Sequence, residues 1–270
     1  SQIVVGSLID HVKCHGNSDG KVSLTVSGGT PGNNPDYTHS WNTTPVQTGA
    51  IAVNLAAGTY TDTVTDANGC QVINSFVVNE PPVISVSDVI TNVSCFGGNN
   101  GTATLTLSGG AGVLSVDWGV MNPNILPAGL HSFTITDSNN CTFVDNVIIS
   151  QPDSISSIEN ITNVSCFGAN DGVTTLTLSG GTGILSVDWG AVNPNTLSAG
   201  THTYTVVDAN SCVLNGSVTI IEPTELKTML TIRDSSSYNV SCFGVCDGWA
   251  SVVPSGGTPG YNYSWSDGQT

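Results

Sequence analysis

The sequence predicts an all-β protein: a tandem array of small Ig-like β-sandwich repeats with one disulfide in each repeat. Three observations predict this fold. One string, which opens N-V-S-C-F-G and closes D-x-N-x-C, occurs at 92–141 and 163–212, with a looser copy at 12–70 and an incomplete one at 239–270. Short runs alternate apolar and polar residues, which is the period of a half-buried strand. Turn-forming Gly, Asn and Pro separate the runs, and no long window has the spacing of an amphipathic helix.

Glu-Pro or Gln-Pro steps mark the boundaries between the repeats. The steps at Glu80, Gln151 and Glu222 give repeat 1 (1–81), repeat 2 (82–152), repeat 3 (153–223) and a truncated repeat 4 (224–270). Proline ends the last strand and stiffens a very short joint, so we expect a rod with limited bending. Because the chain starts at Ser1 and stops within a repeat, we expect an interior piece of a longer secreted chain.

Each predicted strand of one repeat has a counterpart in the other repeats, with apolar residues at the same alternate positions. In repeat 2 the alternating runs are 103–107, 114–118 and 133–135. One tryptophan ends the second run of every copy, at Trp41, Trp118, Trp189 and Trp265. A ring at a fixed position is most simply a core anchor, and a platform for stacking a sugar is the alternative.

Charge excludes two classes of partner. The chain has 20 acidic and 4 basic residues, a net charge of -16, and no base between Lys21 and Lys227. Such a surface cannot neutralise phosphates, so we expect neither nucleic-acid binding nor attraction to anionic lipid. No run of 18 apolar residues is present, so we expect no membrane insertion.

The cysteines suggest disulfides that stabilise a small domain, because a domain of this size has only a small hydrophobic core. Each full repeat has one cysteine before its first strong strand and one after its last Asp-rich turn, which predicts the pairs Cys14–Cys70, Cys95–Cys141 and Cys166–Cys212. Loops of this size contribute about 4 kcal/mol in the chain-entropy model. Zinc is the rival, but the full repeats lack a C-x-x-C pair. Disulfides indicate an extracytoplasmic setting. We expect Cys242 and Cys246 to have partners beyond Thr270, and a bond between these two cysteines is the alternative.

Catalysis finds little support, so we predict no enzyme. The chain has no phosphate loop before a helix, because helix patterns are missing. Calcium is the strongest alternative chemistry, because aspartates recur next to both cysteines of a repeat. The candidates are Asp66, Asp137 and Asp208 before the closing cysteine, and Asp19 and Asp171 after the opening one. Such residues can bind a hard cation, but aspartate in a D-x-N turn normally accepts bonds from its own backbone.

Several strings resemble the SprB-type repeat, named for the gliding-motility adhesin on the surface of Bacteroidetes cells. These are C-F-G-V-C-D-G and S-G-G-T-P-G-Y-N-Y-S-W-S-D-G in repeat 4, and A-G-T-Y and T-D-A-N-G-C in repeat 1. Repeats 2 and 3 depart from the pattern, with L-S-V-D-W in place of the P-x-Y-x-Y segment. The resemblance implies a secreted, repetitive surface adhesin that the type IX pathway exports and the gliding motor carries.

Two D-[S/T]-hydrophobic strings resemble the O-glycan acceptor that Bacteroidetes use. Their acceptor residues are Thr63, in Asp62-Thr63-Val64, and Ser154, in Asp153-Ser154-Ile155. A chance match is the alternative interpretation for either string. Intact mass of the secreted protein tests both.

The function we expect is a structural stalk segment of a long secreted adhesin or filament at the cell surface, which serves adhesion and gliding motility. Its partners would be external surfaces or polysaccharide, through many weak contacts, and the gliding and type IX machinery through other regions. The alternative is a set of carbohydrate- or calcium-binding modules in a secreted multidomain protein. We expect no cofactor other than calcium.

Overall fold

A computed structural model of the chain describes residues 1–33, 36–232 and 240–269, so Arg233, Asn239 and Thr270 lie outside the described residues. The described part folds into strands, turns and loops, and it holds no helix of the length and apolarity needed to cross a membrane. The chain divides into two compact units. The first contains Ser1–Val93 and Gly98–Ser150, and the second contains Ser94–Gly97 and Gln151–Thr270.

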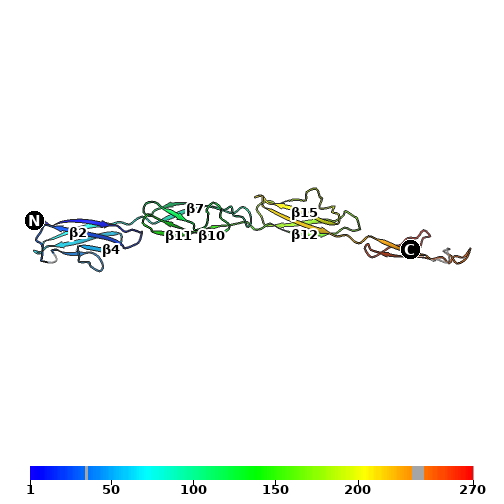
Figure 1. Cartoon of the computed structure of the whole chain (residues 1–270), viewed down its shortest axis with the longest axis horizontal. Helices are drawn as coiled ribbons and strands as arrows, with labels where there is room; N and C mark the ends of the chain where they lie inside the picture. Colours follow the sequence, from blue (N-terminus) through cyan, green and yellow to red (C-terminus); the bar gives the residue numbers. More distant parts are fainter. Residues whose placement is uncertain (34–35, 233–239, 270) are drawn as a thin grey trace. The chain divides into compact units, whose positions relative to one another are not determined.

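Repeat 1 is a sandwich of two antiparallel three-stranded sheets. One sheet has the order β1-β2-β4 and the other β3-β5-β6, and β2 and β4 are labelled in the blue and cyan part of Figure 1. Their bounds are β1 (Val4–Asp10), β2 (Gly20–Ser27), β3 (Thr38–Trp41), β4 (Ile51–Leu55), β5 (Gly58–Thr65) and β6 (Gln71–Val78). The all-β sandwich prediction is confirmed.

Repeats 2 and 3 keep this plan with one strand fewer. In each, a single bridge, Gly101 with Leu126 or Gly172 with Leu197, stands where repeat 1 has β4. Repeat 2 pairs β7 (Ser85–Thr91) with β8 (Thr102–Ser108) and has the second sheet β9 (Ser115–Asp117), β10 (Gly129–Thr136) and β11 (Thr142–Ile149). Repeat 3 pairs β12 (Ser156–Thr162) with β13 (Val173–Ser179) and has β14 (Ser186–Asp188), β15 (Gly200–Val207) and β16 (Val213–Ile220). In repeat 4, β17 (Lys227–Ile232) pairs with β18 (Ala250–Ser255).

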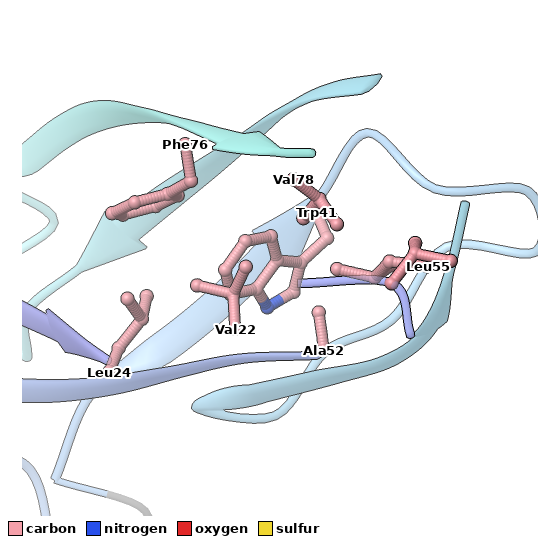
Figure 2. Close-up of a cluster of buried hydrophobic side chains, with 8 residues drawn as sticks. Val22, Leu24, Trp41, Ala52, Leu55, Phe76 and Val78 are labelled. Carbon is pink, nitrogen blue, oxygen red and sulfur yellow. The ribbon is translucent and has the colours of Figure 1, made fainter. Parts of the chain in front are cut away.

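The core of each full repeat lies between its two sheets. In repeat 1, Trp41 of β3 is 1% exposed and lies among side chains of both sheets (Figure 2). Its ring packs against Phe76, with centroids 5.6 Å apart, and its Nε1–H donates to the Gly49 carbonyl at 2.8 Å. Trp118 and Trp189 are half-buried and pack against the cores of repeats 2 and 3. Burial of these three rings supports the core-anchor interpretation.

The S-G-G turn after the first strong strand fixes where each repeat begins. Gly28 has φ 78°, and a Cβ there would lie 2.0 Å from the Gln2 carbonyl oxygen. The next glycine, Gly29, donates its N–H to the Ser1 carbonyl at 3.1 Å. The same bond recurs as Gly110 to Pro82, Gly181 to Asp153 and Gly257 to Thr224. Because these bonds are equivalent, the chain enters every repeat along the same path.

Repeat 1 differs from its neighbours in holding a buried histidine–aspartate contact inside its core. His39 of β3 and Asp62 of β5 are 8% and 0% exposed, and Nδ1 of His39 lies 2.7 Å from Oδ2 of Asp62. Asp62 also accepts the Ser40 N–H at 3.0 Å. Repeats 2 and 3 place Phe133 and Tyr204 at the position of Asp62, in contact with their tryptophans. In repeat 1 Phe76, from another strand, fills that space beside Trp41.

We predict that His39→Val destabilises repeat 1 by about 3–5 kcal/mol, because it leaves a buried carboxylate without its partner. Hydrogen exchange of the β5 amides measures the local loss. The triple change His39→Val, Asp62→Phe and Phe76→Val copies the arrangement in repeat 2, and it should recover most of the lost protection. A loss below about 1 kcal/mol in the single variant would contradict a structural role for the pair.

Candidate functional site: a clasp between consecutive repeats

The two disulfides join cysteines of different repeats. Cys14 of repeat 1 is bonded to Cys141 of repeat 2, and Cys95 of repeat 2 to Cys212 of repeat 3, each with a Cα–Cα distance of 5.6 Å. The predicted pairs Cys14–Cys70, Cys95–Cys141 and Cys166–Cys212 are therefore wrong. Cys70 and Cys166 have free, exposed thiols, as do Cys242 and Cys246.

The length of one strand explains why a repeat cannot close on itself. Residues before Cys14 lie at the end of β6, where the Val12 N–H donates to the Asn79 carbonyl at 3.0 Å. Cys70 directly precedes Gln71, the first of the 8 residues of β6. Eight residues of antiparallel strand span about 27 Å. A disulfide needs Cα atoms within about 7 Å, so the two cysteines of one repeat lie too far apart.

The opening loop is the segment around the first cysteine of each repeat, Lys13–Gly16 in repeat 1. Asp19 accepts the Lys13 N–H at 3.1 Å, and Glu80 accepts the Gly16 N–H at 2.6 Å. Equivalent bonds hold the other loops: Gln151 accepts from Gly97 at 2.8 Å, Glu222 accepts from Gly168 at 2.9 Å, and Asp171 accepts from Ser165 at 3.0 Å. The acidic or amide residue before each boundary proline therefore fastens the opening loop of its own repeat.

The closing turn is the D-x-N-x-C segment, Asp137–Cys141 in repeat 2. Oδ1 of Asp137 accepts the N–H groups of Asn139 and Cys141 at 2.8 and 2.9 Å, and Oδ2 accepts that of Ala111 at 2.8 Å. Asp208 of repeat 3 makes the same three bonds to Asn210, Cys212 and Thr182. One carboxylate thus organises the turn and ties it to the S-G-G turn next to it.

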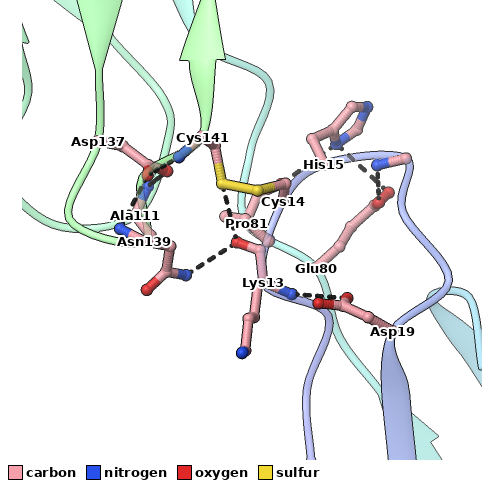
Figure 3. Close-up of a disulfide and its surroundings, with 11 residues drawn as sticks. Lys13, Cys14, His15, Asp19, Glu80, Pro81, Ala111, Asp137, Asn139 and Cys141 are labelled. Carbon is pink, nitrogen blue, oxygen red and sulfur yellow. Dashed lines mark hydrogen bonds and ion pairs between the residues drawn. A yellow bond between two sulfur atoms is a disulfide. The ribbon is translucent and has the colours of Figure 1, made fainter. Parts of the chain in front are cut away.

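The clasp forms where an opening loop meets the closing turn of the following repeat (Figure 3). Beside the disulfide, Nδ2 of Asn139 donates to the Lys13 carbonyl at 2.8 Å. In the second clasp, Nδ2 of Asn210 donates to the Ser94 carbonyl at 3.0 Å. The asparagine of D-x-N-x-C therefore forms a hydrogen bond to the backbone carbonyl of the residue before the opening cysteine. The two cysteines supply the covalent bond.

The closing-turn carboxylates are stabilised in their charged form. The N–H groups of Thr30, Cys70 and Asn68 lower the pKa of Asp66 below its ordinary value of 3.8. Burial acts to raise the pKa values of Asp137 and Asp208, but three backbone N–H bonds to each outweigh it, so both pKa values are lowered. Hydrogen bonds to the ionised form produce such a shift without any cation.

These bonds bear directly on the calcium candidates. Each closing-turn aspartate directs both its oxygens to backbone N–H groups, and Asp19 and Asp171 cap opening loops. Figure 3 shows Lys13 between Asp19 and the Asp137 turn. Across the described ranges, no three His, Cys, Asp or Glu side chains are grouped to hold a metal ion. The geometry favours turn capping, and calcium binding stays a prediction.

The remaining candidates lie away from the clasp. Thr63 is half-buried in β5 between Ser40 and Ile73, beside the fully buried Asp62, whereas Ser154 is exposed just before β12. Trp265 is half-buried in repeat 4. Glycosylation at either acceptor stays a prediction, with Ser154 the more accessible of the two.

Two sets of residues in the clasp were missed by the sequence reasoning. From the sequence alone, the residues before the boundary prolines mark only the repeat boundaries, and Asn139 and Asn210 are only members of the D-x-N turn. The recurrence of Glu, Gln and Glu at 80, 151 and 222 was the available signal, since a strand end alone does not need an acceptor side chain.

Comparison with known families agrees with the repeat pattern. The family model described as SprB repeat matches four segments of the chain, residues 9–46, 87–115, 158–186 and 235–270. Each match includes an opening loop or the strand pair around it. A search of curated proteins finds no match. The resemblance to the SprB repeat is thus confirmed. The SprB repeat family is a family of cell-surface proteins.

We predict that digestion of the oxidised protein yields one peptide pair joining Cys14 to Cys141 and another joining Cys95 to Cys212. Pepsin at acid pH suits this mapping because trypsin has only 4 basic residues to cut at and exchange is slow when thiols are protonated. Cys14→Ser should free the Cys141 thiol, whereas the matched change Cys70→Ser should leave both bonds intact. A peptide pair joining Cys14 to Cys70 would contradict the clasp.

We also predict that Asp66, Asp137 and Asp208 titrate below 3.8 in the folded protein. A lowered folded pKa stabilises the fold above the unfolded value, and this contribution is lost as pH falls through the folded value. The closing turns should therefore loosen only in strong acid. Carboxyl carbon chemical shifts from pH 1.5 to 6 measure each midpoint, and midpoints at or above 3.8 would show that the N–H bonds are not formed in solution.

Proposed function

We propose that this chain of SprB repeats is a load-bearing stalk segment of a long secreted adhesin or filament at the cell surface, and that it serves adhesion and gliding motility. The observation that supports this function best is the pair of disulfides between successive repeats, Cys14–Cys141 and Cys95–Cys212. Disulfides persist outside the cytoplasm, which fits a cell-surface family.

The two bonds overlap along the chain, and the overlap shortens the path that carries tension. From Cys14 to Cys212 the backbone alone runs about 198 residues, or roughly 700 Å when extended. With both bonds intact, the shortest covalent path crosses from Cys14 to Cys141, follows about 46 residues back to Cys95 and crosses to Cys212, roughly 165 Å. Pulling therefore cannot draw out most of the chain, even if every repeat unfolds.

Adhesion in this proposal comes from repetition. A tandem array presents the same surface many times, so contacts with an external surface or polysaccharide that are weak singly become strong together. Force on such contacts is carried along the array, and the clasps limit its lengthening. Attachment to the gliding motor and export by the type IX machinery are assigned to regions outside this segment.

Single-molecule stretching between the two ends of the chain tests the load path. We predict that the oxidised protein releases less than about a quarter of the extension that the reduced protein releases between Cys14 and Cys212. Cys95→Ser should lengthen the oxidised path by about 25 residues, because tension then follows the backbone from Cys141 to Cys212, roughly 90 Å more. Cys14→Ser should lengthen it by about 35 residues, roughly 125 Å.

The size of these two steps separates the possible load paths. If each repeat closed on itself, the same variants would add about 46 and about 56 residues. Equal extension of the oxidised and reduced proteins would show that the disulfides carry no load, and it would overturn the stalk proposal. Cys246→Ser is the matched control, since its thiol is free and lies outside the clasps.

A further inference from the structure

Repeat 1 has a complete closing turn around a free cysteine. Asp66 accepts the N–H groups of Thr30, Asn68 and Cys70 at 3.0, 3.0 and 2.9 Å, the same three bonds that Asp137 and Asp208 make in the clasps. Cys70 is exposed, whereas Cys141 and Cys212 are half-buried beneath opening loops. The turn is therefore in its clasp conformation without a bonded loop.

A shallow hollow beside Cys70 matches the two hollows that hold opening loops. Its walls are residues 1–3 and 70–72 with Asp66. The equivalent walls in repeat 2 are residues 82–84, 141–143 and Asp137, and there Cys14 and His15 complete the lining. In repeat 3 they are residues 153–155, 212–214 and Asp208, completed by Cys95 and Phe96. We name the hollow in repeat 1 the Cys70 socket.

The asparagine of the turn marks the difference between an engaged and a free socket. Asn139 and Asn210 donate their side-chain amides to a carbonyl of an opening loop. Asn68 donates instead to Oγ1 of Thr30 at 2.8 Å. Repeat 3 also has a threonine at that position, Thr182, yet Asn210 bonds to Ser94. The Asn68 amide is thus held beside the place where the carbonyl of an opening loop would lie.

The chain also carries a loop of the shape that this socket fits. In repeat 3 Asp171 accepts the Ser165 N–H at 3.0 Å and Glu222 accepts the Gly168 N–H at 2.9 Å, as in the engaged loop of repeat 1. Cys166 is exposed with a free thiol, and Phe167 is 53% exposed. The opening loop is therefore formed before it engages.

We propose that the Cys70 socket is a docking site for the opening loop of a further SprB repeat joined in frame ahead of Ser1, and that a disulfide to Cys70 locks it. The frame follows from the equivalent carbonyls of Ser1, Pro82, Asp153 and Thr224, each bonded to an S-G-G glycine. The latter three directly follow Pro81, Pro152 and Pro223. A boundary proline placed before Ser1 would therefore continue the array.

Bond formation is a thiol–disulfide exchange. The cysteine of the docking loop and Cys70 each lose a proton and together lose two electrons, and one small-molecule disulfide accepts both electrons and is released as two thiols. Docking brings the two sulfurs together, so this bond should form in preference to other pairings of the free cysteines. The proposal goes beyond the stalk function, because it concerns which surface receives the next repeat.

The test joins a second copy of residues 153–223 directly to Ser1, so that Pro223 of the added copy precedes Ser1. The extended chain and the original chain are equilibrated in oxidised and reduced glutathione, alkylated and digested with pepsin. We expect Cys70 to be alkylated in the original chain and almost fully protected in the extended one, in a peptide pair with Cys166 of the added copy. Cys166→Ser in the added copy alone should restore alkylation of Cys70.

Folding is checked in the same samples, because the pairs Cys14–Cys141 and Cys95–Cys212 must form in every variant. Asn68→Ala in the extended chain should slow protection of Cys70, whereas Asn74→Ala, in β6, should not. Continued alkylation of Cys70 in the extended chain, or its pairing with Cys212 of the added copy, would overturn the proposal. Covalent dimers of the original chain through Cys70 and Cys166 would overturn the in-frame placement.

Discussion

One strand length governs the covalent structure of this protein. In repeat 1, β6 holds the opening loop at its C-terminal end and the closing turn at its N-terminal end, and eight residues separate them. A cysteine at each end therefore cannot reach the other, and each finds a partner only in a neighbouring repeat. The boundary residues Glu80, Gln151 and Glu222 follow from the same geometry, since they extend just past the final strand to the opening loop.

Backbone N–H groups, rather than cationic side chains, stabilise the carboxylates in the loops and turns of this protein. With 20 acidic and 4 basic residues, the chain has few cations to pair with its carboxylates. The aspartates of the closing turns instead accept three N–H bonds each, which keep them charged and fix the turns. This solution is local in sequence, so it can be repeated in every copy. In the core of repeat 1, the buried Asp62 has both kinds of partner, because it accepts the Ser40 N–H and contacts the His39 ring.

The fold was predictable because period-two alternation and the recurring tryptophan report local structure. The turns between the strands follow from the glycine, asparagine and proline residues that separate the alternating runs. The disulfide partners were not predictable, since one cysteine at each end of a repeat is compatible with a bond inside it or with bonds to both neighbours. Only the path of β6 decides, and the order of strands in the sheets fixes that path. The role of Asn139 depends on a contact with Lys13, 126 positions away, which no local pattern reveals.

Pairing between repeats costs little stability relative to pairing within one. If repeat 2 alone unfolds, its chain from the junction near Pro81 to Cys141 stays tethered to repeat 1, a loop of about 60 residues instead of the 46 that separate its own cysteines. Loop-closure entropy grows only as the logarithm of length, so the difference is about 0.2 kcal/mol. The disulfide between repeats is also a second covalent connection across the junction with the neighbouring repeat. With a disulfide inside the repeat, only the backbone would connect the two repeats, so under tension the clasp is the stronger arrangement.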